Sequence, residues 1–221
     1  MKPDLRGYVR SLLDHFGPQG WWPAETPFEV MVGAVLTQNT VWANAERAIA
    51  NLRAAGALAP AALSALPEER LRELVRPAGY FRRKARVLLD LTAWLMERFA
   101  GDAELLRGES AERLRDELLR IRGVGPETAD SILLYAAGVP IFVVDAYTLR
   151  VLARHGARPA GADYESVQRL ARAELPADAD YLGEAHALFV AVGKRFCLRR
   201  RPHCSGCPLN GYLPDGGPAE F

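Results

Sequence analysis

The 221-residue sequence predicts an all-α protein, and three observations lead to this fold class. Ala, Leu and Arg are abundant, and all three favour helix. Apolar residues recur at helical spacing through almost every segment, and the interruptions fall at Gly or Pro. Strand signals are nearly absent, because IFVV at 141–144 is the only β-branched run and its four residues fit a buried connector better than a strand.

The helices can be placed in order along the chain. TPFE at 26–29 is a helix start, in which Thr26 can cap, Pro27 suits the first turn and Glu29 can close a capping box. Including this one, helical patterns cover residues 5–16, 27–38, 41–55, 60–65, 67–76, 81–100, 110–121, 126–137, 145–155, 163–173 and 180–193.

Composition limits the kind of protein. A hydrophobic content of 49% and a charged content of 25% are ordinary for a soluble domain, and the net charge of +1 neither requires nor excludes nucleic acid. No apolar run approaches the roughly 20 residues needed to span a bilayer. The N-terminus carries acids and lacks a small-residue cleavage site, so we expect no secretion signal and a cytoplasmic protein. All three cysteines fall between 197 and 207, which suggests metal ligation rather than disulfides.

The turn GVGPETAD at 123–130 is the first candidate binding element. Gly123 and Gly125 permit positive φ and a close approach of another molecule, and Pro126 suits the first turn of the next helix. Amides at a helix start lack intrahelical partners and attract anions, so a nucleic-acid phosphate is a natural ligand. Val124 can anchor the turn in the core. A tight corner between two helices that binds nothing is the alternative.

Four linked segments resemble the endonuclease III superfamily of DNA glycosylases. Residues 118–136, LLRIRGVGPETADSILLYA, followed by VVDAYTLRVLARHG, resemble its helix-hairpin-helix and catalytic-aspartate segment. LTQNT at 36–40 resembles its intercalating-glutamine segment, and FRRKARVLLDL at 81–91 resembles its basic helix. FCLRRRPHCSGCPL at 196–209 resembles its iron–sulfur loop. The resemblance covers roughly residues 20 to 210.

This resemblance implies the fold and the partner. We expect a two-lobed helix-hairpin-helix glycosylase with a DNA cleft between the lobes. One lobe would be a helical barrel over 24–138, with the hairpin at about 110–137. The other would join 1–23 to 139–221 and carry the Cys-rich loop 197–213. The implied partner is double-stranded DNA containing a damaged base, bound by a monomer in the bacterial-type nucleoid, and no membrane.

Asp145 matches the catalytic aspartate of the family. A glycosylase breaks the bond between a base and its deoxyribose after the nucleotide has been flipped out. The transition state is cation-like at the sugar, so an adjacent carboxylate stabilises it. Asp145 also stands where a helix can start, so it can serve as an N-cap as well.

Glu127 indicates how the bond is broken. Bifunctional members of the family carry a lysine at this position, which attacks the sugar as a Schiff-base nucleophile. A glutamate cannot form that imine, so the resemblance implies a monofunctional enzyme in which water attacks. The acid is also favourable in the first turn of a helix without any catalytic role.

The base implied by the resemblance is an alkylated purine such as 3-methyladenine. GWWP at 20–23, LTQNTVW at 36–42 and VRPAGYFRRKA at 75–85 look like the 3-methyladenine glycosylase branch. A cationic N-alkylpurine leaves without protonation and stacks on aromatic faces, for which Trp21, Trp22 and Trp42 are candidates. The tryptophans can equally serve as core. The adenine–guanine mismatch branch is disfavoured, because its catalytic glutamate has no counterpart at 38–40.

Further residues are candidates for contact with DNA. Gln38 is a candidate wedge that fills the gap left by a flipped nucleotide, and its alternative role is a helix-end cap. Arg83 and Lys84 belong to a basic run that can grip phosphates or form a solvated face. Together with the hairpin, the expected DNA-binding set is Gln38, Arg83, Lys84, Gly123, Val124, Gly125 and Thr128. The resemblance also implies a monovalent cation at the hairpin carbonyls.

The cysteine loop implies a cofactor. Cys197, Cys204 and Cys207 follow the family spacing for a 4Fe–4S cluster, but the fourth cysteine position is Leu213. The fourth ligand could be Asp215, His203 or solvent; a three-iron form and loss of the cluster are alternatives. Zinc ranks lower, because His203 directly adjoins Cys204.

Two other functions compete with this interpretation. One is an oxidised-pyrimidine glycosylase with lyase activity, of endonuclease III type. The other is a non-catalytic relative that binds DNA through the hairpin.

Overall fold

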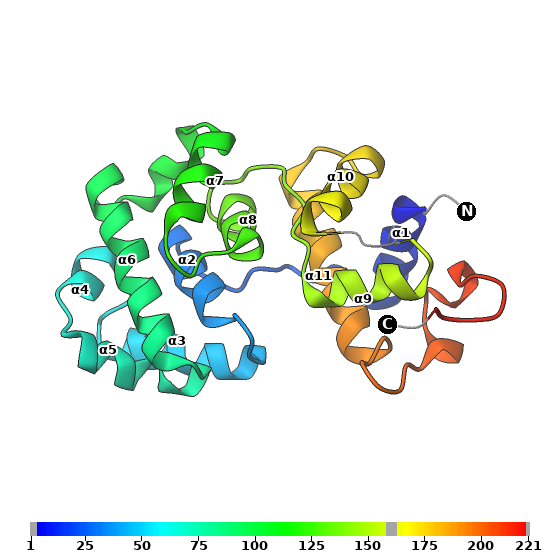
Figure 1. Ribbon diagram of the computed structural model, residues 1–221, viewed down its shortest axis with the longest axis horizontal. Helices are drawn as coiled ribbons and strands as arrows, with labels where there is room; N and C mark the ends of the chain where they lie inside the picture. The colour runs from blue at the N-terminus through cyan, green and yellow to red at the C-terminus, as the bar shows by residue number, and fades with distance from the viewer. Residues whose placement is uncertain (1–3, 158–162, 220–221) are drawn as a thin grey trace. The chain divides into compact units, whose positions relative to one another are not determined.

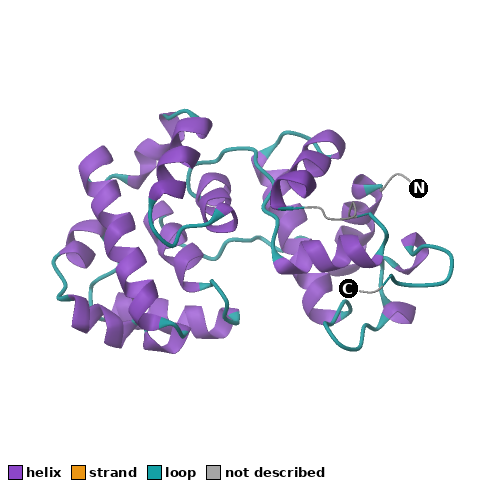
Figure 2. Cartoon of the chain, viewed as in Figure 1, coloured by secondary structure: helices purple, strands orange, loops and turns teal. Residues whose placement is uncertain are grey.

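The chain divides into two compact units, which are visible in the computed structural model (Figure 1). The structure describes residues 4–157 and 163–219. One unit, the hairpin unit, comprises residues 22–139. The other, the terminal unit, joins residues 1–21 to residues 140–221. Within the described ranges every regular element is a helix and no strand is present (Figure 2), so the all-α prediction is confirmed.

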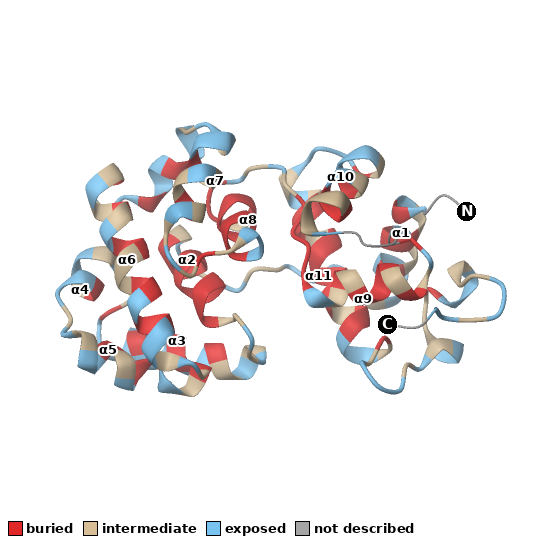
Figure 3. Ribbon diagram, viewed as in Figure 1, coloured by how far each residue is buried: buried red, intermediate tan, exposed pale blue. Residues whose placement is uncertain are grey.

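The hairpin unit contains seven α-helices and two 3₁₀ helices. They are α2 (Pro27–Leu36), α3 (Trp42–Ala54), α4 (Pro60–Ser64), α5 (Glu68–Leu74), η1 (Arg76–Ala78), α6 (Phe81–Phe99), η2 (Ala103–Gly108), α7 (Ala111–Arg120) and α8 (Pro126–Tyr135). Helix α2 is buried on all sides, and its apolar sequence PFEVMVGAVL accounts for this. It packs against α8, which is buried along most of its length (Figure 3).

The terminal unit brings the first helix of the chain onto the last ones. Its elements are α1 (Leu5–Phe16), α9 (Ala146–Arg154), α10 (Tyr164–Glu174), α11 (Ala179–Arg195), η3 (Cys204–Gly206) and η4 (Asn210–Tyr212). Helix α11 forms the centre of this unit, because it packs against both α9 and α1. Its sequence is rich in small and apolar residues, and ten of its residues are buried.

A capping residue fixes the start of α2. Thr26 Oγ1 accepts the backbone N–H of Glu29 at 3.2 Å, and the Glu29 carboxylate accepts the N–H of Glu25 at the same distance. The predicted capping box is therefore present in a shifted form, because the Glu29 side chain accepts the N–H of Glu25 and not that of the capping residue Thr26. Residues 141–144 form no regular element, and Phe142, Val143 and Val144 are buried, as expected for a connector inside the core.

Candidate active site

The hairpin turn between α7 and α8 is a rigid backbone corner. Gly123 has φ +98°, and a Cβ at this position would lie 2.5 Å from a methyl group of Val87 on α6. Val124 is buried and its N–H donates to Ile121 O at 3.0 Å, so it anchors the turn as predicted. Gly125 is extended, at φ −102°, and a Cβ at this position would meet no atom within 4 Å, which leaves room for a ligand on this side of the backbone at the start of α8.

A buried ion pair joins the two helices of the hairpin. Asp130 on α8 is fully buried, and Arg115 on α7 donates to both of its carboxylate oxygens, at 2.7 Å and 3.2 Å. This bidentate geometry fixes the orientation of α7 against α8. The backbone amides at the start of α8 are therefore held in a fixed position relative to α7.

The side chain of Gln38 brings the LTQNT segment to the hairpin. Its amide nitrogen donates to Gly123 O at 3.1 Å and to Thr128 Oγ1 at 2.9 Å. Gln38, Gly123 and Thr128, three of the residues expected to bind DNA, are therefore in contact. A monovalent cation at the hairpin would have to share the Gly123 carbonyl with this amide.

Arg83 and Lys84 are adjacent in sequence but lie in opposite environments. Arg83 is exposed, and its Nε lies 3.8 Å from the point that a Cβ on Gly123 would occupy, which places it beside the hairpin turn. Lys84 is 2% exposed, and its ammonium donates to Leu36 O at 2.9 Å and Ala78 O at 2.7 Å. Burial lowers the pKa of Lys84 to about 8. The Lys84 ammonium therefore ties α6 to α2, and Arg83 is the member of the pair that is open to solvent.

Two of the three candidate pocket tryptophans lie together in the hairpin unit. The Trp22 ring meets the Trp42 ring edge-on at 5.6 Å and the Tyr135 ring at 5.2 Å. Gly33 of α2 allows this arrangement, because a Cβ there would lie 3.0 Å from the Trp22 ring. All three rings are partly exposed, so they form an aromatic surface rather than a sealed core.

Trp21 belongs to the terminal unit and has a different neighbour. The ammonium of Lys194, on α11, lies 5.7 Å from the centre of the Trp21 ring. This distance is within the range of a cation–π contact. The face of Trp21 that Lys194 covers is thus already occupied by a positive charge.

Asp145 is the N-cap of α9. Its Oδ1 accepts the backbone N–H of Thr148 at 2.7 Å, and its Oδ2 lies 3.8 Å from His186 Nε2. The Asp145 side chain is 10% exposed, so most of it is withdrawn from water. Burial on its own would raise the pKa of this carboxyl, but His186 and the Thr148 N–H outweigh burial and lower the pKa below its usual value. The carboxylate is therefore charged at neutral pH, as stabilisation of a cationic sugar requires.

The three cysteines line one small pocket at the end of α11. Val151, Arg154, His155 and Leu213 contribute to the same wall, so Leu213 stands at the position of the missing thiol. Burial raises the pKa of Cys204 and of Cys207. Arg154 donates to Cys197 Sγ at 3.2 Å, and Arg150 donates to Cys197 O at 2.6 Å, so α9 holds the start of the loop.

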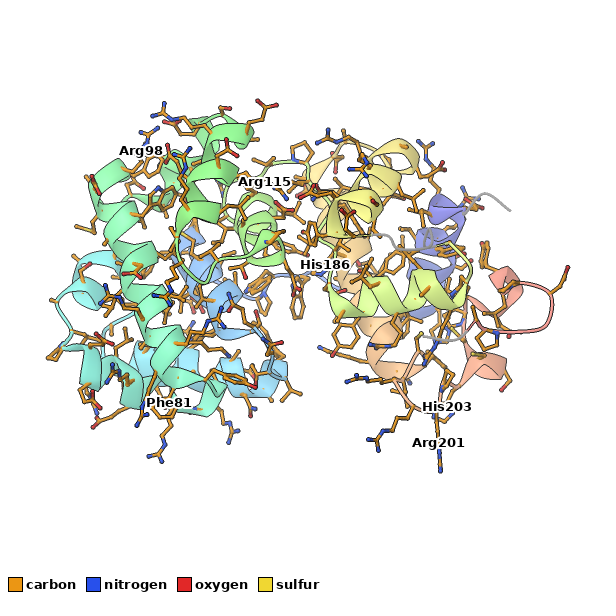
Figure 4. The ribbon with its side chains drawn as sticks, in the orientation of Figure 1. Phe81, Arg98, Arg115, His186, Arg201 and His203 are labelled. Carbon is orange, nitrogen blue, oxygen red and sulfur yellow. The ribbon has the colours of Figure 1, made fainter. Side chains whose placement is uncertain are left out.

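The donor set of this pocket fits an iron–sulfur cluster better than a single metal ion. The described residues include no group of three or more His, Cys, Asp or Glu side chains gathered around one point, as a single metal ion requires. In a cluster each thiolate binds a different iron, so its ligands are spread more widely. The pocket that these thiols share encloses about 310 Å³ of empty space, part of which is open to solvent. In Figure 4, Arg201 and His203 project away from this loop.

Comparison with known proteins identifies the family. The profile of the HhH-GPD superfamily of base excision DNA repair proteins matches residues 32–177, from α2 to beyond α10. The chain belongs to this superfamily. It is a DNA glycosylase, and the resemblance to the endonuclease III superfamily is confirmed.

Similar proteins agree with this assignment. A candidate DNA repair glycosylase of Methanocaldococcus jannaschii is 45% identical over 204 residues, which is 92% of each chain. An endonuclease III in a non-covalent complex with DNA has a TM-score of 0.82 at 25% identity, covering 98% of this chain and 97% of the other. The 3-methyladenine DNA glycosylase of Helicobacter pylori bound to 1,N6-ethenoadenine has a TM-score of 0.77 at 27% identity, covering 87% and 98%. No helix that the structure describes has the length and apolarity to cross a bilayer.

The sequence motifs did not predict the positions of three residues near the candidate sites. His186 faces the candidate catalytic carboxylate, and His155 lines the cysteine pocket. Tyr80 is 70% exposed with φ +45°, an exposed aromatic on strained backbone directly before the basic helix α6. Only Tyr80 had a sequence signal, since it follows Gly79; the two histidines are placed by contacts between helices distant in sequence.

Proposed function

We propose that this glycosylase is monofunctional and removes N-alkylated purines such as 3-methyladenine from double-stranded DNA. Glu127 carries the first part of the proposal. Its side chain is exposed in the first turn of α8, where the resemblance to the family places the Schiff-base lysine of bifunctional members. A carboxylate cannot form an imine with the sugar, so water is the nucleophile.

The chemistry then rests on Asp145. When the N-glycosidic bond breaks, its electron pair moves to the base, and a cationic alkylpurine leaves as a neutral molecule. The sugar becomes electron-poor, and the Asp145 carboxylate stabilises this charge. Water adds to the sugar and gives up a proton to the solvent, which leaves an abasic site in an intact strand. The lowered pKa of Asp145 supports this role, because a protonated acid could not stabilise a cation.

The aromatic surface supports the alkylpurine assignment. Trp22, Trp42 and Tyr135 form a partly exposed group of rings in the hairpin unit. A cationic ring gains about 0.5–2 kcal/mol against an aromatic face, which an unmodified base does not gain. We place Trp22 and Trp42 in the base-binding group and give Trp21 a lesser role, since Lys194 covers one of its faces.

The hairpin supports binding to the DNA backbone. We propose that Gly123, Gly125 and Thr128 present backbone amides to a phosphate, and that exposed Arg83 adds a charge beside them. Val124 contributes by anchoring the turn, since its own N–H donates to Ile121 O. Gln38 would exchange its hydrogen bonds to the hairpin for contacts with the gap left by the flipped nucleotide. Lys84 is left out of this surface, because its ammonium is buried and already bonded.

We propose that Cys197, Cys204 and Cys207 hold an iron–sulfur cluster whose role is to stabilise the loop. The resemblance of residues 196–209 to the iron–sulfur loop of the family and the shared pocket of the three thiols support it. Iron and sulfide analysis of the protein, purified without air, tests this point, and a metal-free, folded protein would refute it.

Analysis of released bases tests the function. The protein is incubated with duplexes that contain 3-methyladenine, an oxidised pyrimidine, uracil opposite guanine or thymine opposite guanine, and the products are identified by mass spectrometry. Release of 3-methyladenine with an intact strand is the expected result. Preferential release of uracil or thymine would overturn the alkylpurine assignment and leave the water-driven reaction in place. Release of the oxidised pyrimidine with strand cleavage would favour the lyase, and release of no base would favour a binding protein.

A further inference from the structure

The terminal unit holds a second ionisable side chain at the Asp145 carboxylate. His186, in the middle of α11, lies with its Nε2 at 3.8 Å from Asp145 Oδ2, and its side chain is 7% exposed. Figure 4 labels His186 on the α11 segment that lies against α9. The mechanism given above uses the aspartate and a water molecule, and assigns nothing to this histidine.

A carboxylate in this position meets a physical conflict. It has to be ionised to stabilise a cationic sugar, but removal from water favours its protonated form. The cap bond from the Thr148 N–H, 2.7 Å long, occupies Oδ1. Oδ2 is the oxygen that remains for the sugar, and it is the one that faces His186.

We propose that His186 is a positioning residue that keeps the Asp145 carboxylate charged and holds its Oδ2 in a fixed orientation. This inference rests on the proposed catalytic role of Asp145. The imidazole can act through its positive charge when protonated and through an N–H when it is neutral. At 3.8 Å a protonated imidazole is close enough to favour the charged carboxylate, and a shift of less than about 1 Å brings its N–H within hydrogen-bond distance of Oδ2.

The other charged and titratable groups around the pair make their contacts elsewhere. On α9, Arg150 donates to Gly193 O and to Cys197 O and lies 5.0 Å from the Tyr147 ring. Burial and the Asp145 charge raise the pKa of Tyr147, so its phenol stays neutral.

One polar group on α10 and one on α11 also make contacts away from Oδ2. From α10, the Tyr164 hydroxyl accepts the N–H of Val144 at 3.4 Å. Lys194 on α11 lies over Trp21. The strongest favourable influence on the Asp145 carboxylate therefore comes from His186, followed by the Thr148 N–H.

Two substitutions separate the charge of His186 from its hydrogen-bonding ability. His186→Gln keeps an N–H donor and removes the charge, whereas His186→Phe removes both and keeps a ring of similar shape. His15→Gln is the matched control, since His15 is an exposed histidine on α1 that packs on Phe16 and Phe196. A ¹³C NMR titration of the Asp145 carboxyl is compared in the four proteins, together with the pH profile of single-turnover excision.

The expected result is a graded change. Asp145 becomes a weaker acid by roughly tenfold in His186→Phe and by less in His186→Gln, and the acid limb of the excision profile moves to higher pH in the same order. Affinity for an undamaged duplex and the behaviour of His15→Gln stay at the wild-type level. If His186 only filled space in the core, its substitutions would change the stability of the protein and leave the Asp145 titration and the pH profile of excision unchanged.

Unchanged titration of Asp145 in both variants would overturn the inference. Loss of the fold in both would also overturn it, since His186 would then be a structural residue. Failure of the proposed function is visible separately, because wild-type protein would then release no base, or Asp145→Asn would release base as well as wild type. The NMR comparison still decides the relationship between His186 and Asp145 in that case.

Discussion

Asp145 accepts the backbone N–H of Thr148 at 2.7 Å, so one side chain is both the cap of α9 and the candidate catalytic carboxylate. The cap uses Oδ1 and leaves Oδ2 for other contacts. Because the two roles use different oxygens, a substitution can remove the charge of the carboxylate and still keep the helix cap. Two substitutions of Asp145 exploit this arrangement.

Asp145→Asn is expected to abolish excision while keeping the fold. Asparagine caps a helix as well as aspartate does, so the loss of stability should stay below about 1 kcal/mol. Its amide carries no charge, and excision should fall at least ~100-fold because the cationic sugar loses its stabilising group. Single-turnover excision and denaturant unfolding measure the two effects. Asp145→Ala should lose excision equally and lose about 1 kcal/mol more stability through the missing cap. Near-normal excision by Asp145→Asn would remove Asp145 from the mechanism.

Glu127→Lys is expected to create a covalent contact with abasic DNA. An amine at this position can attack the sugar aldehyde, lose water and form an imine, which borohydride reduces to a stable secondary amine. Wild-type protein and Glu127→Gln should give no such adduct on a denaturing gel. The cost in stability should be about 0.3–1 kcal/mol, since a cation replaces an anion at a helix N-terminus. An adduct with wild-type protein would contradict the monofunctional proposal.

Local signals predicted more of this molecule than long-range contacts did. The start of α2 at Pro27 follows from its capping residue, and the end of α7 follows from the glycine turn, because these effects act within a few residues. The burial of Val124 follows from its place between two glycines. The burial of Lys84 could not be predicted, because it depends on carbonyls at the ends of two other elements. The approach of His186 to Asp145 likewise depends on the packing of α11 against α9, which are not adjacent in the chain.

The ion pair inside the hairpin is expected to dominate its stability. Arg115→Leu removes the guanidinium that binds both oxygens of buried Asp130, and should cost about 3 kcal/mol, since the carboxylate stays buried. Arg113→Leu is the matched control on the same helix. Arg113 pairs with Glu117, and the Arg113 side chain is 61% exposed. Loss of this ion pair should therefore cost less than about 1 kcal/mol of stability. Denaturant unfolding compares the two. Equal costs would show that the Arg115 pair does not brace the hairpin.

Arg83 and Lys84 are expected to differ in the salt dependence of DNA binding. If Arg83 neutralises a phosphate, Arg83→Met should reduce the slope of log K against log salt by about one. Lys84→Met should leave the slope unchanged, because the Lys84 ammonium donates to Leu36 O and Ala78 O. Fluorescence anisotropy with one undamaged duplex over a range of salt measures both slopes. If only Lys84→Met reduced the slope, Lys84 and not Arg83 would be the residue that contacts the phosphate, and our proposal would be wrong on this point.

Lys84 is also expected to make stability rise with pH in the alkaline range. Burial lowers its pKa from 10.5 to about 8 in the folded protein. Between these two values the unfolded chain holds more protons than the folded chain, so raising the pH disfavours unfolding. Below pH 8 both states are protonated, and the penalty for burying the ammonium is fully present.

Unfolding of wild type and Lys84→Met by denaturant between pH 7.5 and 10 tests this expectation. The free energy of unfolding of wild type, relative to that of Lys84→Met, should increase with pH by up to roughly 3 kcal/mol. Tyrosine and cysteine titrations occur in both proteins and therefore cancel in the difference. The chain has three lysines, so little else can titrate differently between the two. A difference that stays constant over this range would mean that the Lys84 ammonium is stabilised by its two carbonyl partners as fully as it is by water.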